Sequence, residues 1–290
     1  MKLSKALLGA VLVGITAQTT ACTKGDEPAP KGEKVAKGSE KKNARLLPRV
    51  WPGLSNAPET MAAVPALPSI LSAIACNLDD HLLAAALPLL EAGQVEAVEW
   101  SFDTLFDGRQ LPNWFAELLT AYGEQGRLIG HGVYFSLLSG RWTPEQAQWL
   151  EQLRLLAARF HFDHITEHFG SFTGQNFHTG APLPVPYTAA ILRLGQDRLL
   201  RIADACQCPV GLENLAFAYS LEEVQRHGEF LEKLLAPVNG FLILDLHNLY
   251  CQLHNFDLST DSLLALYPLH RVRGNPHFGR QLGRFAGGAG

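Results

Sequence analysis

Five consecutive stretches of this chain have the pattern of buried β-strands, and each ends in side chains that can bind a metal ion. The strand sequences are VEAVEWS, RLIGHGVYF, FDHITEHFGSF, PVGLENL and FLILDLHNLY. In chain order they supply Glu99; His131; Glu167 with His168; Glu213 with Asn214; and Asp245 with His247 and Asn248. The first residues of these groups stand 32 to 46 positions apart, enough for a strand, a helix and two loops. This repeat predicts an α/β barrel whose strand ends meet at one mouth.

Helical patterns fill the intervals between these strands. Residues 72–78 add an earlier strand, and residues 143–146 read Thr-Pro-Glu-Gln, a capping box with proline at the first helical position. Strands that are apolar on both faces predict a parallel sheet covered by helices. An open doubly wound sheet would alternate in the same way, but no glycine-rich phosphate loop follows the first strand. We therefore expect one TIM-barrel (β/α)8-type domain over residues 65–273.

The charge of the chain is divided unevenly along its length. Residues 1–46 hold nine Lys or Arg and four acids, whereas the remainder holds fifteen Lys or Arg and twenty-four acids. An acidic body repels polyanions, so we expect no nucleic-acid partner. The five cysteines include no CxxC pair, which excludes a zinc ribbon by spacing. Cys206 and Cys208 flank one residue before a predicted strand, where buried structural thiols are the commoner interpretation.

Residues 1–46 do not share the pattern of the barrel. Met1–Lys5 is basic, Ala6–Ile15 is apolar, and small residues precede Cys22, as in a signal peptide or lipoprotein anchor. The following residues, 24–45, are rich in charge, glycine and proline, which predicts a disordered linker. We expect a cytoplasmic protein, and the alternative is export or membrane anchoring through residues 1–22.

The strand-end residues carry the functional prediction as a group. A single Glu or His at a strand end is more often hydrogen-bonded to a loop, and an Asn there often starts a turn. Four carboxylates around one mouth, however, would repel one another unless cations neutralise them. Imidazole and carboxylate ligands without thiolate favour iron, manganese or zinc. The sequence therefore predicts a metal centre.

Several motifs resemble one family. GHGVYFSL, ITEHFGSF followed by PLPVPYT, GLENL, and ILDLHNLYCQLHNFD followed by YPLHRVR are similar, in order and spacing, to the DUF692 family of multinuclear non-haem iron-dependent oxidases. The resemblance covers about residues 68–273. It implies a TIM barrel with two or three irons that uses O2 to modify cysteines of a ribosomally made precursor peptide. A separate peptide-binding partner protein accompanies such enzymes in many cases.

The resemblance also implies the residues of the metal site, and no catalytic residue beyond them. The implied ligands are His131, Glu167, Glu213, Asp245 and His247, with Glu99, His168, Asn214, Asn248 and Asn255 as ligands or close support. We include Glu99 and His168 among the predicted ligands. His178 and His254 are weaker candidates.

Both ends of the chain depart from the family pattern. Residues 274–290 read GNPHFGRQLGRFAGGAG where the family has a seventh-strand histidine and a final βα unit. We expect an unstructured tail and a barrel that is incomplete at its C-terminus, with His277 a poor substitute for the missing histidine. The start, MKLSKALLGAVLVGIT with a later Cys-Thr-Lys, resembles the leader of precursor peptides that this family processes.

We therefore predict an iron-dependent oxidase of peptide cysteines. The alternative is a xylose-isomerase-like barrel that uses divalent ions for isomerisation or phosphoester hydrolysis. A third interpretation is a non-catalytic, membrane-tethered remnant, which would bind no metal. Metal content and O2 consumption separate the three.

Overall fold

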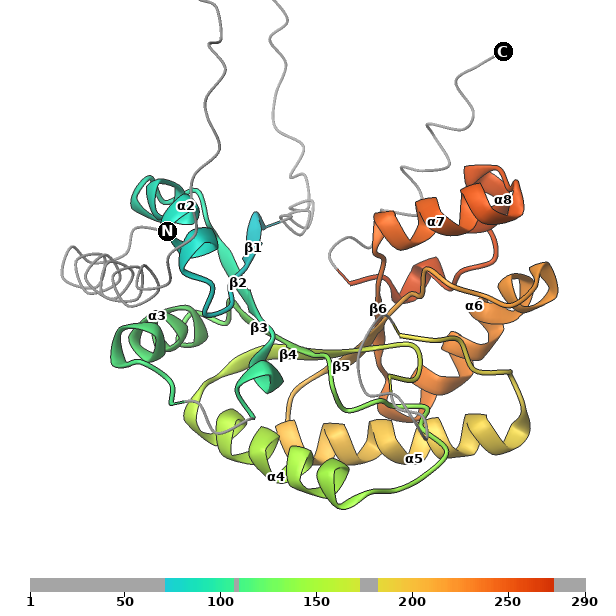
Figure 1. Ribbon diagram of the computed structural model, residues 1–290, viewed down its shortest axis with the longest axis horizontal. Coiled ribbons are helices and arrows are strands. Elements are labelled where there is room, and N and C mark those ends of the chain that lie inside the picture. The colour runs from blue at the N-terminus through green and yellow to red at the C-terminus, as the bar shows by residue number, and fades with distance from the viewer. Residues whose placement is uncertain (1–70, 107–109, 173–181, 274–290) are drawn as a thin grey trace, which may run out of the picture.

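The computed structural model describes residues 71–106, 110–172 and 182–273, and its elements alternate between strand and helix (Figure 1). In chain order the elements are β1 (Ala73–Ala75), α2 (Asp80–Glu91), β2 (Ala97–Trp100), η1 (Phe102–Leu105), α3 (Asn113–Gly123), β3 (Leu128–Gly132), α4 (Pro144–Arg159), β4 (Phe162–His168), α5 (Ala189–Cys206), β5 (Val210–Glu213), α6 (Leu221–Leu235), η2 (Ala236–Val238), β6 (Phe241–Ile243), α7 (Leu246–Phe256), α8 (Thr260–Leu264) and η3 (Leu269–Arg271).

The six strands form one parallel sheet in the order β1-β2-β3-β4-β5-β6. Each strand pairs with the next one along the chain, so the order never reverses as it does in a doubly wound sheet. Figure 1 shows the sheet as a curved trough with α3, α4, α5 and α6 along its outer side. This α/β arrangement is that of a TIM barrel, as predicted.

Helix caps and aromatic packing explain why these elements form where they do. Thr143 and Gln146 complete the predicted capping box of α4, and Thr188 and Ser220 cap α5 and α6 with their side chains. Between the sheet and the helices, the buried Trp100 ring makes edge contacts with three phenylalanine rings, of Phe102, Phe115 and Phe160. This core fixes the strands whose ends carry the polar residues.

After β6 the chain begins another pairing with the sheet. Val272 forms a parallel bridge with Leu242, and the Arg273 amide donates to the Leu242 carbonyl at 3.0 Å. Within the described ranges the sheet is not closed into a ring, because β1 and β6 are not paired. The predictions for residues 1–46, for His178 and for residues 274–290 with His277 fall outside the described residues. In the described part of the chain, no helix is long and apolar enough to cross a membrane.

Candidate metal centre

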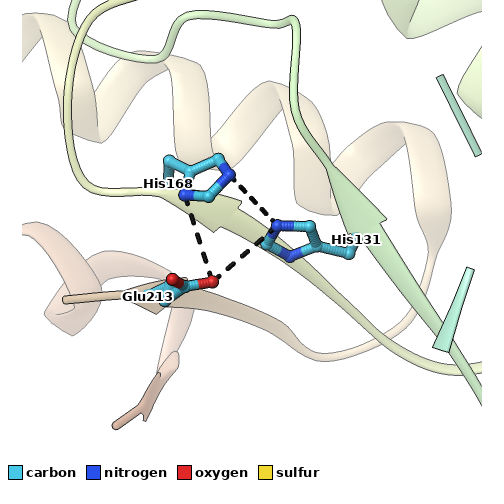
Figure 2. Close-up of side chains that lie close together, drawn as sticks. All are labelled: His131, His168 and Glu213. Carbon is cyan, nitrogen blue, oxygen red and sulfur yellow. Dashed lines mark hydrogen bonds and ion pairs between the residues drawn. The ribbon is translucent and has the colours of Figure 1, made fainter. Parts of the chain in front are cut away.

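Three side chains from neighbouring strands converge at the carboxyl end of the sheet. The two imidazoles approach with His131 Nε2 and His168 Nε2 3.1 Å apart. Glu213 Oε2 lies 3.8 Å from His131 Nε2 and 4.0 Å from His168 Nδ1. Figure 2 shows the three side chains around one point, and one ligand atom from each lies within 4.8 Å of the others. The group has the composition and spacing of a metal site.

Strand register brings these residues together. His168 on β4 is paired with Glu213 on β5, and His131 on β3 is paired with Thr166 on β4. Since side chains two positions apart on a strand share a face, Thr166 and His168 both lie on the face that carries His131. Each ligand therefore comes from the end of a different strand, as in other barrel sites.

Thr166 fixes the orientation of one imidazole. Its hydroxyl oxygen lies 2.8 Å from His131 Nδ1 and 3.4 Å from the Gly130 carbonyl oxygen. Both contacts are satisfied when the hydroxyl donates to the carbonyl and accepts the Nδ1 proton. That tautomer leaves the lone pair of His131 Nε2 directed at the cluster, the arrangement that a metal-ligating histidine requires.

Burial keeps both imidazoles neutral. Burial lowers the pKa of His131 to about 4. Burial together with the neighbouring His131 lowers the pKa of His168 to about 3. At neutral pH both rings therefore offer lone pairs, which is the state that binds metal.

The carboxyl groups of the site repel one another. Burial, with the charges of Asp245 and Glu99, raises the pKa of Glu213 to about 7. Burial and the charge of Asp245 also raise the pKa of Glu99. These three carboxyl groups are thus close enough to interact, as the sequence predicted for a shared mouth. A bound cation would relieve their repulsion.

Two asparagines join the ends of β5 and β6 behind Glu213. Asn248 Nδ2 donates to Glu213 Oε1 at 2.9 Å and to the Asn214 carbonyl at 2.9 Å. The side chain of Asn214 accepts from the Asp245 amide at 2.6 Å and donates to the Asp245 carbonyl at 3.1 Å. Asp245 in turn caps α7 by accepting from the Asn248 amide. Both asparagines therefore support the site, and the bond to Asn248 leaves Glu213 Oε2 facing the histidines.

Other predicted ligands lie on α7 and are not among the three side chains of the cluster. His247 is exposed, and its Nε2 atom lies 3.8 Å from the Cys251 sulfur. His254 and Asn255 are also exposed, and the His254 ring stacks on Tyr250. Asp245 is the only predicted ligand from this region whose charge acts on Glu213 in the described part of the chain.

Glu167 is not brought into the cluster either. It precedes His168 on β4, and successive strand residues face opposite sides of a sheet. Its carboxyl group is fully buried, and neither oxygen has a hydrogen-bond partner in the described structure. A Cβ atom on Gly132 would lie 2.0 Å from Glu167 Oε1 and 3.0 Å from the Trp149 ring. Glu167 thus occupies the space beside α4 that the missing side chain of Gly132 leaves open.

Asp103 was not singled out from the sequence, yet it organises the loop after β3. Its Oδ2 atom accepts from the amides of Val133 and Tyr134 at 2.8 and 2.7 Å and from Trp149 Nε1 at 2.9 Å. Burial raises the pKa of Glu167 well above its usual range, and the charge of Asp103 raises it further. A single carboxylate in the stretch WSFD carries no motif that would have revealed this role.

Sequence similarity relates this chain to a family and to individual bacterial proteins. Residues 99–279 match the model of the family described as RiPP precursor modification enzyme MbnB/TglH/ChrH. Relatives include UPF0276 proteins of Acinetobacter baylyi, 27% identical over 54% of this chain and 54% of the relative. The relative from Acaryochloris marina is 29% identical over 61% of this chain and 63% of its own length. The relative from Caulobacter vibrioides is 29% identical over 49% of this chain and 50% of its own length. The chain thus spans between 50% and 63% of the length of these curated relatives.

Two solved structures are also similar. Endonuclease IV from Thermus thermophilus matches with a TM-score of 0.44 and 16% identity, over 70% of this chain and 74% of that chain. The structure of SacUVDE matches with a TM-score of 0.39 and 16% identity, over 64% of this chain and 61% of that chain. The family model covers more than half of the chain, from the end of β2 past η3. The chain therefore belongs to the MbnB/TglH/ChrH family of RiPP precursor modification enzymes.

Proposed function

We propose that this protein is an iron-dependent oxidase that uses O2 to modify a cysteine of a ribosomally synthesised precursor peptide. The observation that carries the proposal is the cluster of His131, His168 and Glu213 at the sheet mouth, in a chain of a precursor-modifying family. Two neutral imidazoles and a carboxylate, without thiolate, fit iron, manganese or zinc. Iron, when bound, supplies O2 activation and a Lewis acid that accepts a substrate thiolate.

The protein's own residues would hold this centre and limit access to it. His131 Nε2, His168 and Glu213 Oε2 present the ligand atoms, and Thr166 and Asn248 hold His131 and Glu213 in place. Glu99 and Asp245 add negative charge beside Glu213. This surplus of carboxylates supports a second iron at the mouth, as the resemblance to multinuclear oxidases implies. A substrate thiol would ionise here only once metal is bound, because the carboxylates alone oppose a thiolate.

The peptide substrate is the other part of the proposal. The family acts on RiPP precursors, and we extend this to a cysteine side chain as the modified group, with a peptide-binding protein as the partner. In this scheme the metal held by His131, His168 and Glu213 would bind the thiol. The rest of the peptide would be recognised elsewhere on the protein surface. Nucleic acid plays no part in this scheme, in keeping with the acidic body.

The test measures metal and oxygen together. Full-length protein is purified without oxygen, its iron, zinc and manganese contents are measured, and O2 uptake is followed with cysteine-containing peptides encoded beside its gene. We expect bound iron and O2 uptake with one such peptide, together with a mass change on its cysteine. Glu213→Gln should lose both, and Glu117→Gln, on the exposed face of α3, should retain both. Bound zinc or manganese with O2-independent turnover would instead support the isomerase or phosphoesterase alternative.

A further inference from the structure

Exposed apolar side chains gather behind the carboxyl ends of three strands. In the described part of the chain, five large hydrophobic residues with exposed fractions of 45% to 66% follow β3, β5 or β6 by no more than seven positions: Tyr134, Phe217, Tyr219, Leu246 and Tyr250. Because the carboxyl ends of parallel strands meet at one mouth, these residues form an apolar rim around the metal cluster. Apolar side chains that gather in one place, instead of lying singly, indicate a binding surface.

The first part of this chain has the chemistry that such a rim would bind. Ala6–Ile15 is an apolar run, and residues 1–46 carry five more positive than negative charges. The rest of the chain carries nine more negative than positive charges. Two exposed acids lie beside the rim, Glu222 in the first turn of α6 and Asp257 at the end of α7. The segment and the rim are therefore complementary in apolar surface and in charge.

Chain lengths allow Cys22 to reach the metal cluster from this position. Cys22 lies seven positions after Ile15, a span of at most about 25 Å. Phe217 of the rim lies four positions after Glu213, a span of at most about 14 Å. The tether to Leu71, the first described residue, has 49 steps and extends to about 175 Å. A domain of about 200 residues has a radius of gyration of only about 16 Å, so the tether reaches the mouth from either end of the barrel.

The cluster itself has room for a sulfur ligand. It supplies three ligand atoms, and a metal that acts on a substrate keeps a further position open. Of the described cysteines, Cys76 and Cys206 are buried, and Cys208 precedes β5 at the end opposite to the cluster. Cys251 on α7 is the other thiol at the mouth end of the sheet, and it serves as the control.

We propose, as an extension of the proposed function, that residues 1–22 of this chain dock on the apolar rim and present the Cys22 thiol to a metal held by the cluster. The chain would then carry its own substrate cysteine. On binding, the sulfur–hydrogen bond breaks, the proton leaves to solvent, and the sulfur forms a coordinate bond to the metal without a change of oxidation state. The tether holds the thiol at an effective concentration in the millimolar range, so no second molecule is needed.

The experiment titrates full-length protein with Co2+ in the absence of oxygen. A sulfur ligand gives a thiolate-to-cobalt charge-transfer band in the near ultraviolet, which imidazole and carboxylate ligands do not give. We expect this band in wild type, its loss in Cys22→Ser and its retention in Cys251→Ser. Iodoacetamide should label Cys22, in the tryptic peptide of residues 6–24, about tenfold more slowly with Co2+ than without it. Dilution of the protein should change neither result, because thiol and metal site belong to one chain.

Variants of the rim test where the segment docks. Tyr219→Ser and Tyr250→Ser should each restore part of the labelling rate, whereas Leu155→Ser, at a similarly exposed position on α4, should not. Cobalt binding without the band, an unchanged band in Cys22→Ser, protection that falls on dilution or a lipid attached to Cys22 would each overturn the proposal and leave the metal site standing. A failure to bind cobalt at all would count against the metal site, and so against both proposals.

Discussion

Replacing Glu213 by glutamine should change stability in opposite directions with and without metal. Moving the pKa of this carboxyl from 4.5 to about 7 means that its ionised form costs the metal-free native state roughly 3 kcal/mol. The side chain is 14% exposed, so solvent screening reduces this figure only in part. Glutamine removes the charge, keeps the volume and still accepts from Asn248. The metal-free variant should therefore be more stable than wild type at pH 8.

The sign of the pH dependence follows from the direction of the shift. Below about pH 4.5 the Glu213 carboxyl is protonated in both native and unfolded states, so wild type suffers no penalty. Between about pH 4.5 and about 7 the unfolded state releases this proton while the native state keeps it, so wild type progressively loses stability relative to the variant until the native carboxyl also ionises. The advantage of the variant should be below about 1 kcal/mol at pH 5 and roughly 3 kcal/mol at pH 8.

Urea unfolding of full-length protein with a chelator, at pH 5 and pH 8, measures this advantage. Glu117→Gln, on the exposed face of α3, is the matched control and should show no pH-dependent gain. With ferrous iron at a hundred times its dissociation constant and without oxygen, wild type should gain about 2.7 kcal/mol and the variant much less. A metal-free variant no more stable than wild type at pH 8 would refute the interpretation that burial and neighbouring charges oppose the ionisation of Glu213.

Three further changes probe the surroundings of the cluster. Thr166→Val removes the hydroxyl that orients His131 and should weaken iron binding by about 10- to 100-fold in titrations, with the fold retained. Gly132→Ala places a Cβ atom 2.0 Å from Glu167 Oε1 and should destabilise the protein by about 1–3 kcal/mol in urea unfolding. Glu167→Gln should leave the iron content unchanged and stabilise the metal-free protein more at pH 8 than at pH 5, since burial raises the pKa of Glu167. A fall in its iron content would show that Glu167 is a ligand after all.

The strands and their order could be predicted because the relevant signals are local. Apolar runs bounded by turn residues indicated all six strands, and the near-regular interval between them indicated the sequential parallel order. The capping box at Thr143 fixed the start of α4 to the residue. The pairing of Val272 with Leu242 was not foreseen, because the sequence after Tyr267 has no strand pattern and the contact depends on the position of β6.

The members of the cluster were harder to predict than the strands, because a motif does not say which way its residues face. At the end of β6, Asp245 and His247 would share a face if the strand continued. Asp245 instead caps α7, which begins at Leu246. Positions two apart on a helix point about 200° apart, so the helix start turns His247 away from Asp245 and into solvent. Hydrophobicity alone did not separate the end of this strand from the start of its helix.

On β4 the sequence already indicated that Glu167 and His168 face opposite sides of the sheet. The family resemblance nevertheless implied that both residues belong to the metal site. Ile165 is apolar and belongs on the face that packs against helices, which places Glu167 on that same face and Thr166 with His168 on the other. The structure follows this alternation: Ile165 and Glu167 are fully buried, and Thr166 contacts His131. Two adjacent strand residues can both reach one metal only if the strand end twists or ends between them. Since β4 continues through His168, the simplest physical interpretation assigns one of the two to the metal and leaves Glu167 as a buried acid beside Asp103.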